Sequence, residues 1–326
     1  MRVRGFAWWR IGAAVVGTVA LLAAPADGAT ASLGHGADSI DPSTRADITA
    51  AMRGEAFAYA RYRAYAAQAA RERLPDVQAL FERTAAVELG EHFAEQAKMT
   101  GPSGDNIANL RDAIAGESYE ATSMYKEFAT QAEVDGDLNA ARLFKEISSD
   151  EARHHRQFVQ ALKAVSDPAS GVTVPAGVTA EPVSVPAGKP EVSSPRTLRN
   201  LRSAIGGEAF AHAKYALYAE RARATGQPEL AALFDRTAQV ELTEHFAEEA
   251  KLAGLVRDTK SNLCEAIAGE NREGNRMYPT YARQAATIGD TTVAELLTDT
   301  ASDELGHARA FTGALSALGG RCPASG

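Results

Sequence analysis

Cysteine is almost absent from this sequence of 326 residues, which contains only Cys264 and Cys322. No Cys-x-x-Cys pair occurs, and this excludes a zinc ribbon, an iron centre held by thiolates and a disulfide framework. Basic residues are outnumbered, because 34 lysines and arginines face 42 aspartates and glutamates. The resulting net charge of −8 argues against nucleic acid as a partner.

Strand patterns are also missing, because no stretch sustains the alternation of apolar and polar residues that a β-strand shows. From residue 46 onward, apolar residues instead recur every three to four positions, as in amphipathic helices. Residues 166–195 are rich in proline, valine and glycine and read as a semi-extended linker. The sequence therefore predicts an all-α protein with one four-helix unit over 46–165, a second over 196–319 and a tail over 320–326.

The N-terminus has the features of a secretory signal peptide over residues 1–31. Three arginines lie within its first ten residues, an apolar run follows over 11–24, and small residues at 29–31 offer a cleavage site. The apolar run is short for a membrane span, so cleavage is favoured over an uncleaved anchor. We therefore expect an exported protein, with residues 32–45 as a loose leader.

Glutamates and histidines on the predicted inner helix faces repeat at one fixed offset. In the first unit they are Glu55, Glu88, His92, Glu117, Glu120, Glu151 and His154. Their counterparts, each 153 residues further on, are Glu208, Glu241, His245, Glu270, Glu273, Glu304 and His307. Within each unit a shorter repeat of 62 or 63 residues relates the two halves. Each unit therefore looks like a duplicated helical hairpin, and each hairpin supplies one helix with glutamate alone and one with glutamate and histidine.

Such a set of side chains predicts a site for two metal ions. Glutamates on two helices, with Glu-x-x-His on the other two, are the ligands of a carboxylate-bridged pair of metals in a four-helix bundle. Carboxylates and imidazoles suit iron or manganese. Glu88 and His92 are four residues apart where Glu151 and His154 are three apart. One inserted residue is commonly absorbed as a π-bulge, so both residues are expected to be ligands.

These residues closely resemble the rubrerythrin family over both units. The resemblance rests on Gly-Glu at 54 and 207, on Gly-Glu-x-x-Glu-x-x-x-Met-Tyr at 116 and 269, and on Glu-x-x-His at 151 and 304. It implies two ferritin-like bundles in tandem and a non-haem site with two iron ions per unit, manganese being an alternative. It further implies a role in reducing hydrogen peroxide to water.

The resemblance also implies roles for individual residues. The fourteen glutamates and histidines would be metal ligands, with Glu120 and Glu273 taking part in redox-linked movement of one iron. Four tyrosines would hydrogen-bond to ligand carboxylates in the catalytic site: Tyr62, Tyr125, Tyr215 and Tyr278.

The expected function is that of an exported di-iron peroxidase acting in oxidative-stress defence. No rubredoxin-like segment with four cysteines follows, so the electron donor is expected to be external and its identity is unknown. Hydrogen peroxide or oxygen would be the small-molecule substrate, and homodimer formation is left open. Two alternatives are an iron-handling ferroxidase and a non-catalytic bundle whose metals only stabilise the fold.

The connection between the second and third helices raises a topological alternative. In a closed bundle the chain must return about 30 Å along the bundle axis, whereas the break over 101–104 reaches only about 14 Å. Either residues 105–115 form a separate crossing helix, or the two units exchange hairpins, which is the favoured alternative. Exchange would join Glu55, Glu88 and His92 to Glu270, Glu273, Glu304 and His307, and Glu208, Glu241 and His245 to Glu117, Glu120, Glu151 and His154.

Three further residues are expected to have no part in the chemistry. Cys264 corresponds to Arg111 in the first unit, and its pairing with Cys322 is the less favoured alternative even in an exported protein. His155 and His212 are expected on the surface.

Overall fold

The computed structural model describes residues 40–101 and 104–323. The expected signal peptide over 1–31 and most of the expected leader over 32–45 lie outside the described residues. The described residues form helices and no strand, which confirms the all-α prediction. None of the helices in this part of the chain combines the length and the apolar character needed to cross a bilayer.

Both halves of the chain contain four helical rods, two of which are interrupted by a short π-helical segment. In the first half these are α1 (Pro42–Arg71), α2 (Pro75–Val87) with Glu88–Phe93 and α3 (Ala94–Thr100), α4 (Asn106–Tyr119) with Glu120–Met124 and α5 (Tyr125–Asp135), and α6 (Leu138–Ser166). In the second half they are α7 (Pro195–Ala224), α8 (Pro228–Val240) with Glu241–His245 and α9 (Phe246–Leu252), α10 (Thr259–Arg272) with Glu273–Met277 and α11 (Tyr278–Ile288), and α12 (Thr291–Ala317).

Side-chain caps fix where several helices begin. Asp41 accepts a hydrogen bond from the backbone N–H of Ser43 at 2.8 Å, and Pro42 occupies the first helical position of α1. Residues 42–45 therefore belong to the helix, and their assignment to the leader was wrong. Asp105 caps α4 in the same manner by accepting from the N–H of Ala108 at 2.7 Å.

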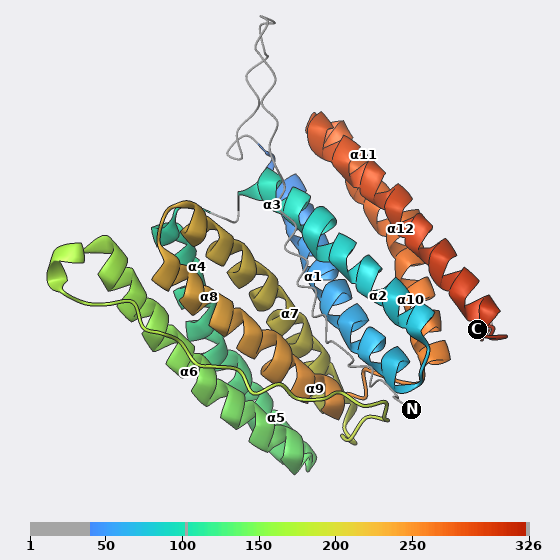
Figure 1. Ribbon diagram of the computed structural model, residues 1–326, viewed down its shortest axis with the longest axis horizontal. Coiled ribbons are helices and arrows are strands. Elements are labelled where there is room, and N and C mark those ends of the chain that lie inside the picture. The colour runs from blue at the N-terminus through green and yellow to red at the C-terminus, as the bar shows by residue number, and fades with distance from the viewer. Residues whose placement is uncertain (1–39, 102–103, 324–326) are drawn as a thin grey trace, which may run out of the picture. The chain divides into compact units, whose positions relative to one another are not determined.

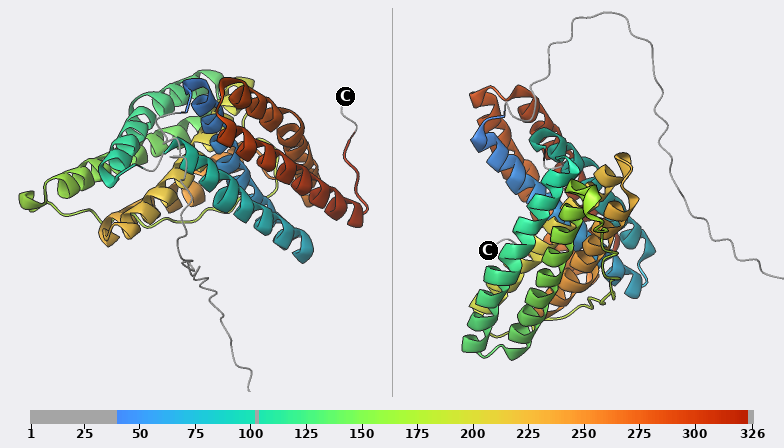
Figure 2. Two further views of the ribbon diagram at one scale, coloured as in Figure 1. Left: turned by 90° about the horizontal axis from the view of Figure 1, so that it is seen from above. Right: turned by 90° about the vertical axis from the view of Figure 1, so that its left-hand side faces the viewer.

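The two bundles are built by exchange between the halves of the chain. One bundle combines α1, α2 and α3 with α10, α11 and α12, which Figures 1 and 2 show as blue and cyan helices beside orange and red ones. The other combines α4, α5 and α6 with α7, α8 and α9. The bundles pack on each other through α1 and α7. The favoured alternative, exchange of hairpins between the repeats, is thus what the structure shows.

The short link between α3 and α4 explains why exchange occurs. Helix α3 ends at Thr100, and Gly101 closes it in the left-handed conformation with φ of 62°. Helix α4 runs from Asn106 to Tyr119 without interruption, so no separate crossing helix forms over 105–115. The chain passes directly into the neighbouring bundle and avoids the return that its few linking residues could not span.

Aromatic residues from both halves fill the core beside each group of acidic side chains. Tyr62 and Phe81 of the first half pack on Phe311 of the second, with ring centroids 5.3 and 5.0 Å from its ring. Phe158 makes the corresponding contacts in the other bundle, 5.3 Å from Tyr215 and 5.2 Å from Phe234. These buried rings stabilise the exchanged arrangement, because each cluster needs side chains from both halves.

The linker over 166–195 follows an extended path along the surface of the helices. The N–H of Val183 donates to the carbonyl oxygen of Thr243 at 2.8 Å, and Arg71 donates to the carbonyl oxygen of Val185 at 2.8 Å. Val185 is itself buried. The linker has no core of its own, as expected, but it is fixed by backbone contacts to the helices beneath it.

The structure pairs Cys264 with Cys322 in a disulfide, with Cα atoms 5.4 Å apart. The pairing considered less favoured from the sequence is therefore the one observed. It fastens the C-terminal tail to α10, and no cysteine of the described chain is left free. A pairing between a helix and a tail outside any repeat leaves no periodic signal in the sequence.

Candidate metal centres

Two clusters of buried acidic side chains and histidines lie inside the two bundles. Centre A consists of Glu55, Glu88, His92, Glu270, Glu304 and His307. Centre B consists of Glu117, Glu151, His154, Glu208, Glu241 and His245. Each centre takes three residues from each half of the chain, as the exchanged arrangement predicts. All of these side chains are buried except His307, which is partly exposed.

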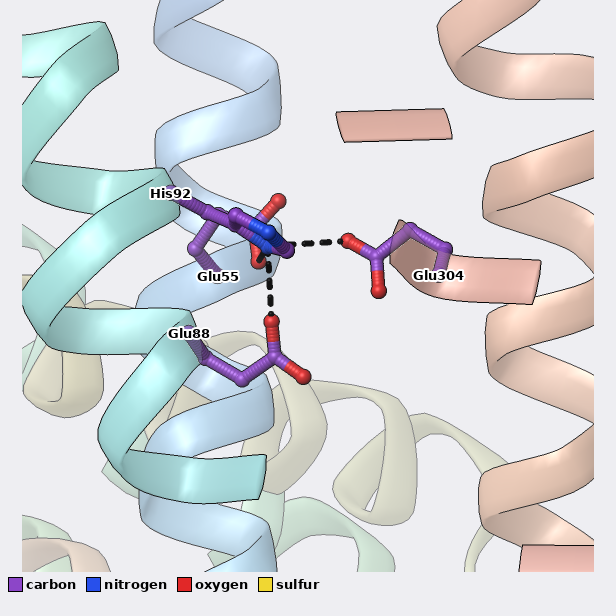
Figure 3. Close-up of side chains that lie close together, drawn as sticks. All are labelled: Glu55, Glu88, His92 and Glu304. Carbon is purple, nitrogen blue, oxygen red and sulfur yellow. Dashed lines mark hydrogen bonds and ion pairs between the residues drawn. The ribbon is translucent and has the colours of Figure 1, made fainter. Parts of the chain in front are cut away.

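In centre A, His92 points its Nδ1 atom at carboxylates from three helical rods. Nδ1 lies 3.1 Å from Oε2 of Glu88, 3.3 Å from Oε1 of Glu304 and 3.7 Å from Oε2 of Glu55. Figure 3 shows Glu55, Glu88 and Glu304 converging on this ring, with Glu304 coming from α12 on the opposite side. One nitrogen and three oxygens at such spacing form a set of ligand atoms for one cation.

His307 forms a second such set, and Glu88 and Glu304 belong to both. Oε1 of Glu88 and Oε2 of Glu304 lie 3.2 and 3.1 Å from Nδ1 of His307. Glu270 completes the set at 3.5 Å. Glu88 and Glu304 therefore each present one oxygen to each histidine, which is the geometry of carboxylates that bridge two metal ions.

Centre B repeats this arrangement closely. Glu151 lies 3.0 Å from His154 and 3.1 Å from His245 through different oxygens. Glu241 likewise lies 3.2 and 2.9 Å from the same two histidines. The histidine rings are 5.8 Å apart in both centres. Each histidine of centre B faces one further carboxylate, at 3.5 and 3.6 Å, from Glu117 and Glu208 respectively.

The π-helical turns place these ligands. The segments Glu88–Phe93 and Glu241–His245 are π-helical, as the extra residue between glutamate and histidine predicts. The wider turn brings a glutamate and a histidine four residues apart onto one inner face. Two further π-helical segments, Glu120–Met124 and Glu273–Met277, lie in the first rods of the other two hairpins and were not anticipated from the sequence.

Each non-bridging glutamate accepts a hydrogen bond from a tyrosine in the other half of the chain. The hydroxyl of Tyr215 donates to Oε1 of Glu117 at 2.5 Å. The corresponding pairs are Tyr62 with Glu270, Tyr278 with Glu55, and Tyr125 with Glu208. These hydrogen bonds fix one oxygen of each carboxylate and leave the other directed at the histidine.

The donor set fits a pair of cations. The four carboxylates of each centre carry about the charge that two divalent ions would neutralise. Burial raises the pKa of Glu270 to about 9 and that of Glu208 to about 8. Several carboxylate oxygens of Glu241, Glu304 and their neighbours are buried without a hydrogen bond. Buried acids with unsatisfied oxygens are costly unless positive charge meets them, so the clusters are suited to metal.

Aspartates lie behind two of the histidines. Nε2 of His245 lies 3.6 Å from Asp150, and Nε2 of His92 lies 3.6 Å from Asp303. A proton on Nε2 facing a carboxylate leaves the lone pair of Nδ1 free for a metal. These aspartates immediately precede the glutamate of each Glu-x-x-His, and the shared offset of 153 residues could have revealed them.

Two expected ligands do not join the centres. Within the described residues, neither Glu120 nor Glu273 contributes an oxygen to the sets of ligand atoms that lie within 4.8 Å of one another. The carboxylate of Glu273 pairs with Arg272 at 3.2 Å. The carboxylate of Glu120 lies against Gly207 of α7, where an added Cβ would meet it at 3.7 Å. Both glutamates sit beside the metal positions, one helical turn from a ligand.

Corresponding polar residues complete the surroundings of the tyrosines. Gln96 donates to the hydroxyl of Tyr278 at 3.0 Å, and buried Glu249 accepts from the hydroxyl of Tyr125 at 3.1 Å. Neither residue was predicted from the sequence, because the two corresponding positions hold different residue types, an amide in one half and an acid in the other.

His212 was wrongly expected on the surface. It is buried, stacks on Tyr59 with ring centroids 5.5 Å apart, and its Nδ1 lies 2.7 Å from the carbonyl oxygen of Ala238. This contact forms where α1 and α7 join the two bundles, so it depends on packing between repeats. His155 is half-buried.

Comparison with known proteins agrees with this geometry. A family model described as Rubrerythrin matches residues 108–183 and 199–315. The nigerythrin of Nitratidesulfovibrio vulgaris is 34% identical over 131 residues, which are 36% of this chain and 65% of that protein. The rubrerythrin of Porphyromonas gingivalis is 33% identical over 138 residues, which are 38% of this chain and 68% of that protein.

The rubrerythrin of Nitratidesulfovibrio vulgaris is 32% identical over 129 residues, which are 36% of this chain and 67% of that protein. The chain thus spans about two thirds of the length of these relatives. No solved structure gives a significant match. Because the family model covers more than half of the chain, in two separate segments, this protein belongs to the rubrerythrin family.

Proposed function

We propose that this protein is an exported di-iron peroxidase that reduces hydrogen peroxide to water with electrons from an external donor. The observation that carries the proposal is the double bridge in each centre, where two glutamates each face two histidines. Membership of the rubrerythrin family supports iron as the metal. Manganese is the alternative, since carboxylate and imidazole ligands suit both metals.

Reduction of one peroxide to two waters requires two electrons and two protons. Bound iron would supply the two electrons, and the external donor would restore them. In centre A, Glu88 and Glu304 would hold the two ions. Tyr62 and Tyr278 orient the carboxylates of Glu270 and Glu55. The buried aromatic residues beside each centre exclude bulk water from the ligands.

Both centres are complete within one chain, so the proposal does not require a homodimer. Export is supported by the signal-like N-terminus and by the disulfide between Cys264 and Cys322, because disulfides persist in oxidising compartments. N-terminal sequencing of the protein recovered outside the cytoplasm tests export directly. Cleavage near residue 31 is expected, and an intact N-terminus would contradict the proposed processing.

Rapid mixing tests the reaction itself. Protein loaded anaerobically with Fe(II) is mixed with peroxide or with oxygen, and the ferric absorbance is followed. A peroxidase oxidises much faster with peroxide and consumes further peroxide when a reductant is supplied. Iron accumulating well beyond two ions per centre would instead identify an iron-handling ferroxidase. A loaded protein that is inert towards both oxidants would identify metals that only stabilise the fold.

A further inference from the structure

The two centres have similar ligands but different surroundings at one corresponding position. Arg61 of α1 and Lys214 of α7 are related by the repeat, and each lies next to a site tyrosine, Tyr62 or Tyr215. Gly269 and Gly116, each directly before a non-bridging glutamate, are also related by the repeat. Comparing the space above these two glycines therefore shows how open the approach to each centre is.

Beside centre B this space is open. An added Cβ at Gly116 would meet nothing within 4 Å. A cavity of about 450 Å³ lies there, lined by Gly116, Glu120, Lys214 and Tyr215 among others. The hydroxyl of Tyr215 donates to Glu117, a residue of centre B, at 2.5 Å. The cavity thus reaches Tyr215, whose hydroxyl contacts a ligand of centre B directly.

Lys214 stays at the wall of this cavity because an acid holds it there. Its ammonium group lies 2.7 Å from Oδ2 of Asp112, and the hydroxyl of Tyr218 donates to the same oxygen at 2.7 Å. No atom of Lys214 lies within 4 Å of a Cβ added at Gly116, so the cation does not close the space above that glycine.

Beside centre A the space is occupied. Arg61 is only 7% exposed, and its guanidinium would lie 3.3 Å from a Cβ added at Gly269. The same group donates to the hydroxyl of Tyr62 at 3.1 Å, and Tyr62 in turn donates to Glu270 of centre A. No carboxylate lies within ion-pair distance of Arg61 among the described residues, and its Nε atom has no hydrogen-bond partner there.

A difference in neighbouring charges explains why the two cations behave differently. The counterpart of Asp112 is Glu265, which pairs with Arg257 at 3.2 Å. In the first half the position of Arg257 is taken by Gly104, so Asp112 lacks this arginine partner and pairs with Lys214 instead. Arg257 thus pairs with Glu265, the carboxylate that would otherwise attract Arg61 outward. Arg61 instead lies over Gly269.

We propose that the cavity beside Glu120 admits small oxidants and small anions to centre B, whereas Arg61 closes the corresponding approach to centre A. The ligands concerned are of the size of peroxide or azide. The inference rests on the proposed metal binding and makes the two centres kinetically unequal. Arg61 and Lys214 act in this as residues that control access, without being metal ligands.

Azide binding to the full-length, iron-loaded and oxidised protein tests this proposal by absorbance, without turnover. Metal analysis comes first. Protein that holds no metal would refute the proposed function, whereas unequal access to the two centres is tested only on protein that holds metal. Two phases are expected, each with about half of the amplitude and at least about tenfold apart in rate, equivalent to about 1.4 kcal/mol in barrier height. A single phase at both centres would overturn the proposal.

Variants assign the phases. Glu304→Gln, which damages centre A, should retain the fast phase, and Glu151→Gln, which damages centre B, should retain the slow one. Arg61→Ala should convert the slow phase into a fast one, and an unchanged slow phase would refute the role of Arg61. Should thermal melting show that Arg61→Ala is unfolded, Arg61→Met keeps most of the buried stem and gives the same readout. The reverse assignment of fast and slow phases would also contradict the proposal.

Discussion

Oε1 of Glu88 lies 3.2 Å from Nδ1 of His307, although the two residues belong to different halves of the chain. The other oxygen of the same carboxylate lies 3.1 Å from His92, in its own half. This one side chain therefore joins both ligand sets of centre A and both halves of the protein. Because Glu241 has the same position in centre B, the two centres can be damaged separately.

Replacing Glu88 by glutamine should empty centre A and spare centre B. The amide keeps the shape of the side chain but removes the bridging charge that both ions share. Metal analysis of purified protein is expected to fall from about four ions per chain to about two. Glu91→Gln, three residues away and exposed, is the matched control and should keep the full content. Full metal content in Glu88→Gln would show that this carboxylate does not bridge.

Replacing Asp150 by asparagine should weaken metal binding at centre B. Asp150 faces Nε2 of His245 at 3.6 Å and is 28% exposed, so it stabilises the proton there. Losses of about 10- to 100-fold in affinity are typical for such partners. Asp303 has the same relation to His92 but is 62% exposed, so Asp303→Asn should cost less. Competition with a chelator measures both, and equal losses would contradict this ranking.

The metal-free protein should lose stability as the pH rises from about 5 to 9. Burial raises the pKa of Glu270 to about 9 and that of Glu208 to about 8, so the folded state keeps protons that the unfolded state releases above its ordinary glutamate pKa. Burial lowers the pKa of His307, but its contacts with carboxylates raise it to about 12. The stability that the protonated His307 contributes is fully present below the pKa of histidine in the unfolded state, and it is likewise lost as the pH rises.

Thermal melting at several pH values tests this expectation. Metal-free protein should melt at a lower temperature at pH 9 than at pH 6. Metal-loaded protein should show the opposite trend or none, because bound cations favour the ionised carboxylates. A melting temperature of the metal-free protein that increases with pH would mean that the buried acids are already ionised at pH 6.

Reducing the disulfide should lower stability and leave the metal content unchanged. The bond between Cys264 and Cys322 closes a segment with a sequence separation of 58, for which loop-closure entropy allows up to about 4 kcal/mol. Neither cysteine touches the ligand sets of centre A or B. Cys322→Ser, compared with untreated protein by chemical denaturation and metal analysis, measures the two effects separately. Loss of metal in this variant would connect the tail to the centres.

Much of the fold was predictable because each motif, weak by itself, occurs twice at the same offset in the sequence. The offset of 153 residues identified fourteen candidate ligands, of which twelve converge, and the extra residue before His92 indicated the π-helical turn. Chain reach favoured exchange of hairpins over a separate crossing helix, because the break after α3 is too short for a return along one bundle.

The features that escaped prediction depend on contacts outside the repeat pattern. Arg61 lies against Tyr62, while Arg257 pairs with Glu265. His212 is buried because two bundles meet at its position. Glu120 and its counterpart Glu273 have the same spacing as ligands, yet their carboxylates stay outside the ligand sets, that of Glu120 beside Gly207 and that of Glu273 paired with Arg272. These positions depend on which side chains meet in the folded structure, and such contacts leave no periodic pattern in the sequence.

The linker over 166–195 makes assembly of each centre independent of dilution. A pair of metals held between two separate polypeptides would be released when those polypeptides part at low concentration. Here each hairpin meets its complement at an effective concentration fixed by the tether. The proposed export would take the protein into a large volume, where such internal assembly would keep the ligand sets together.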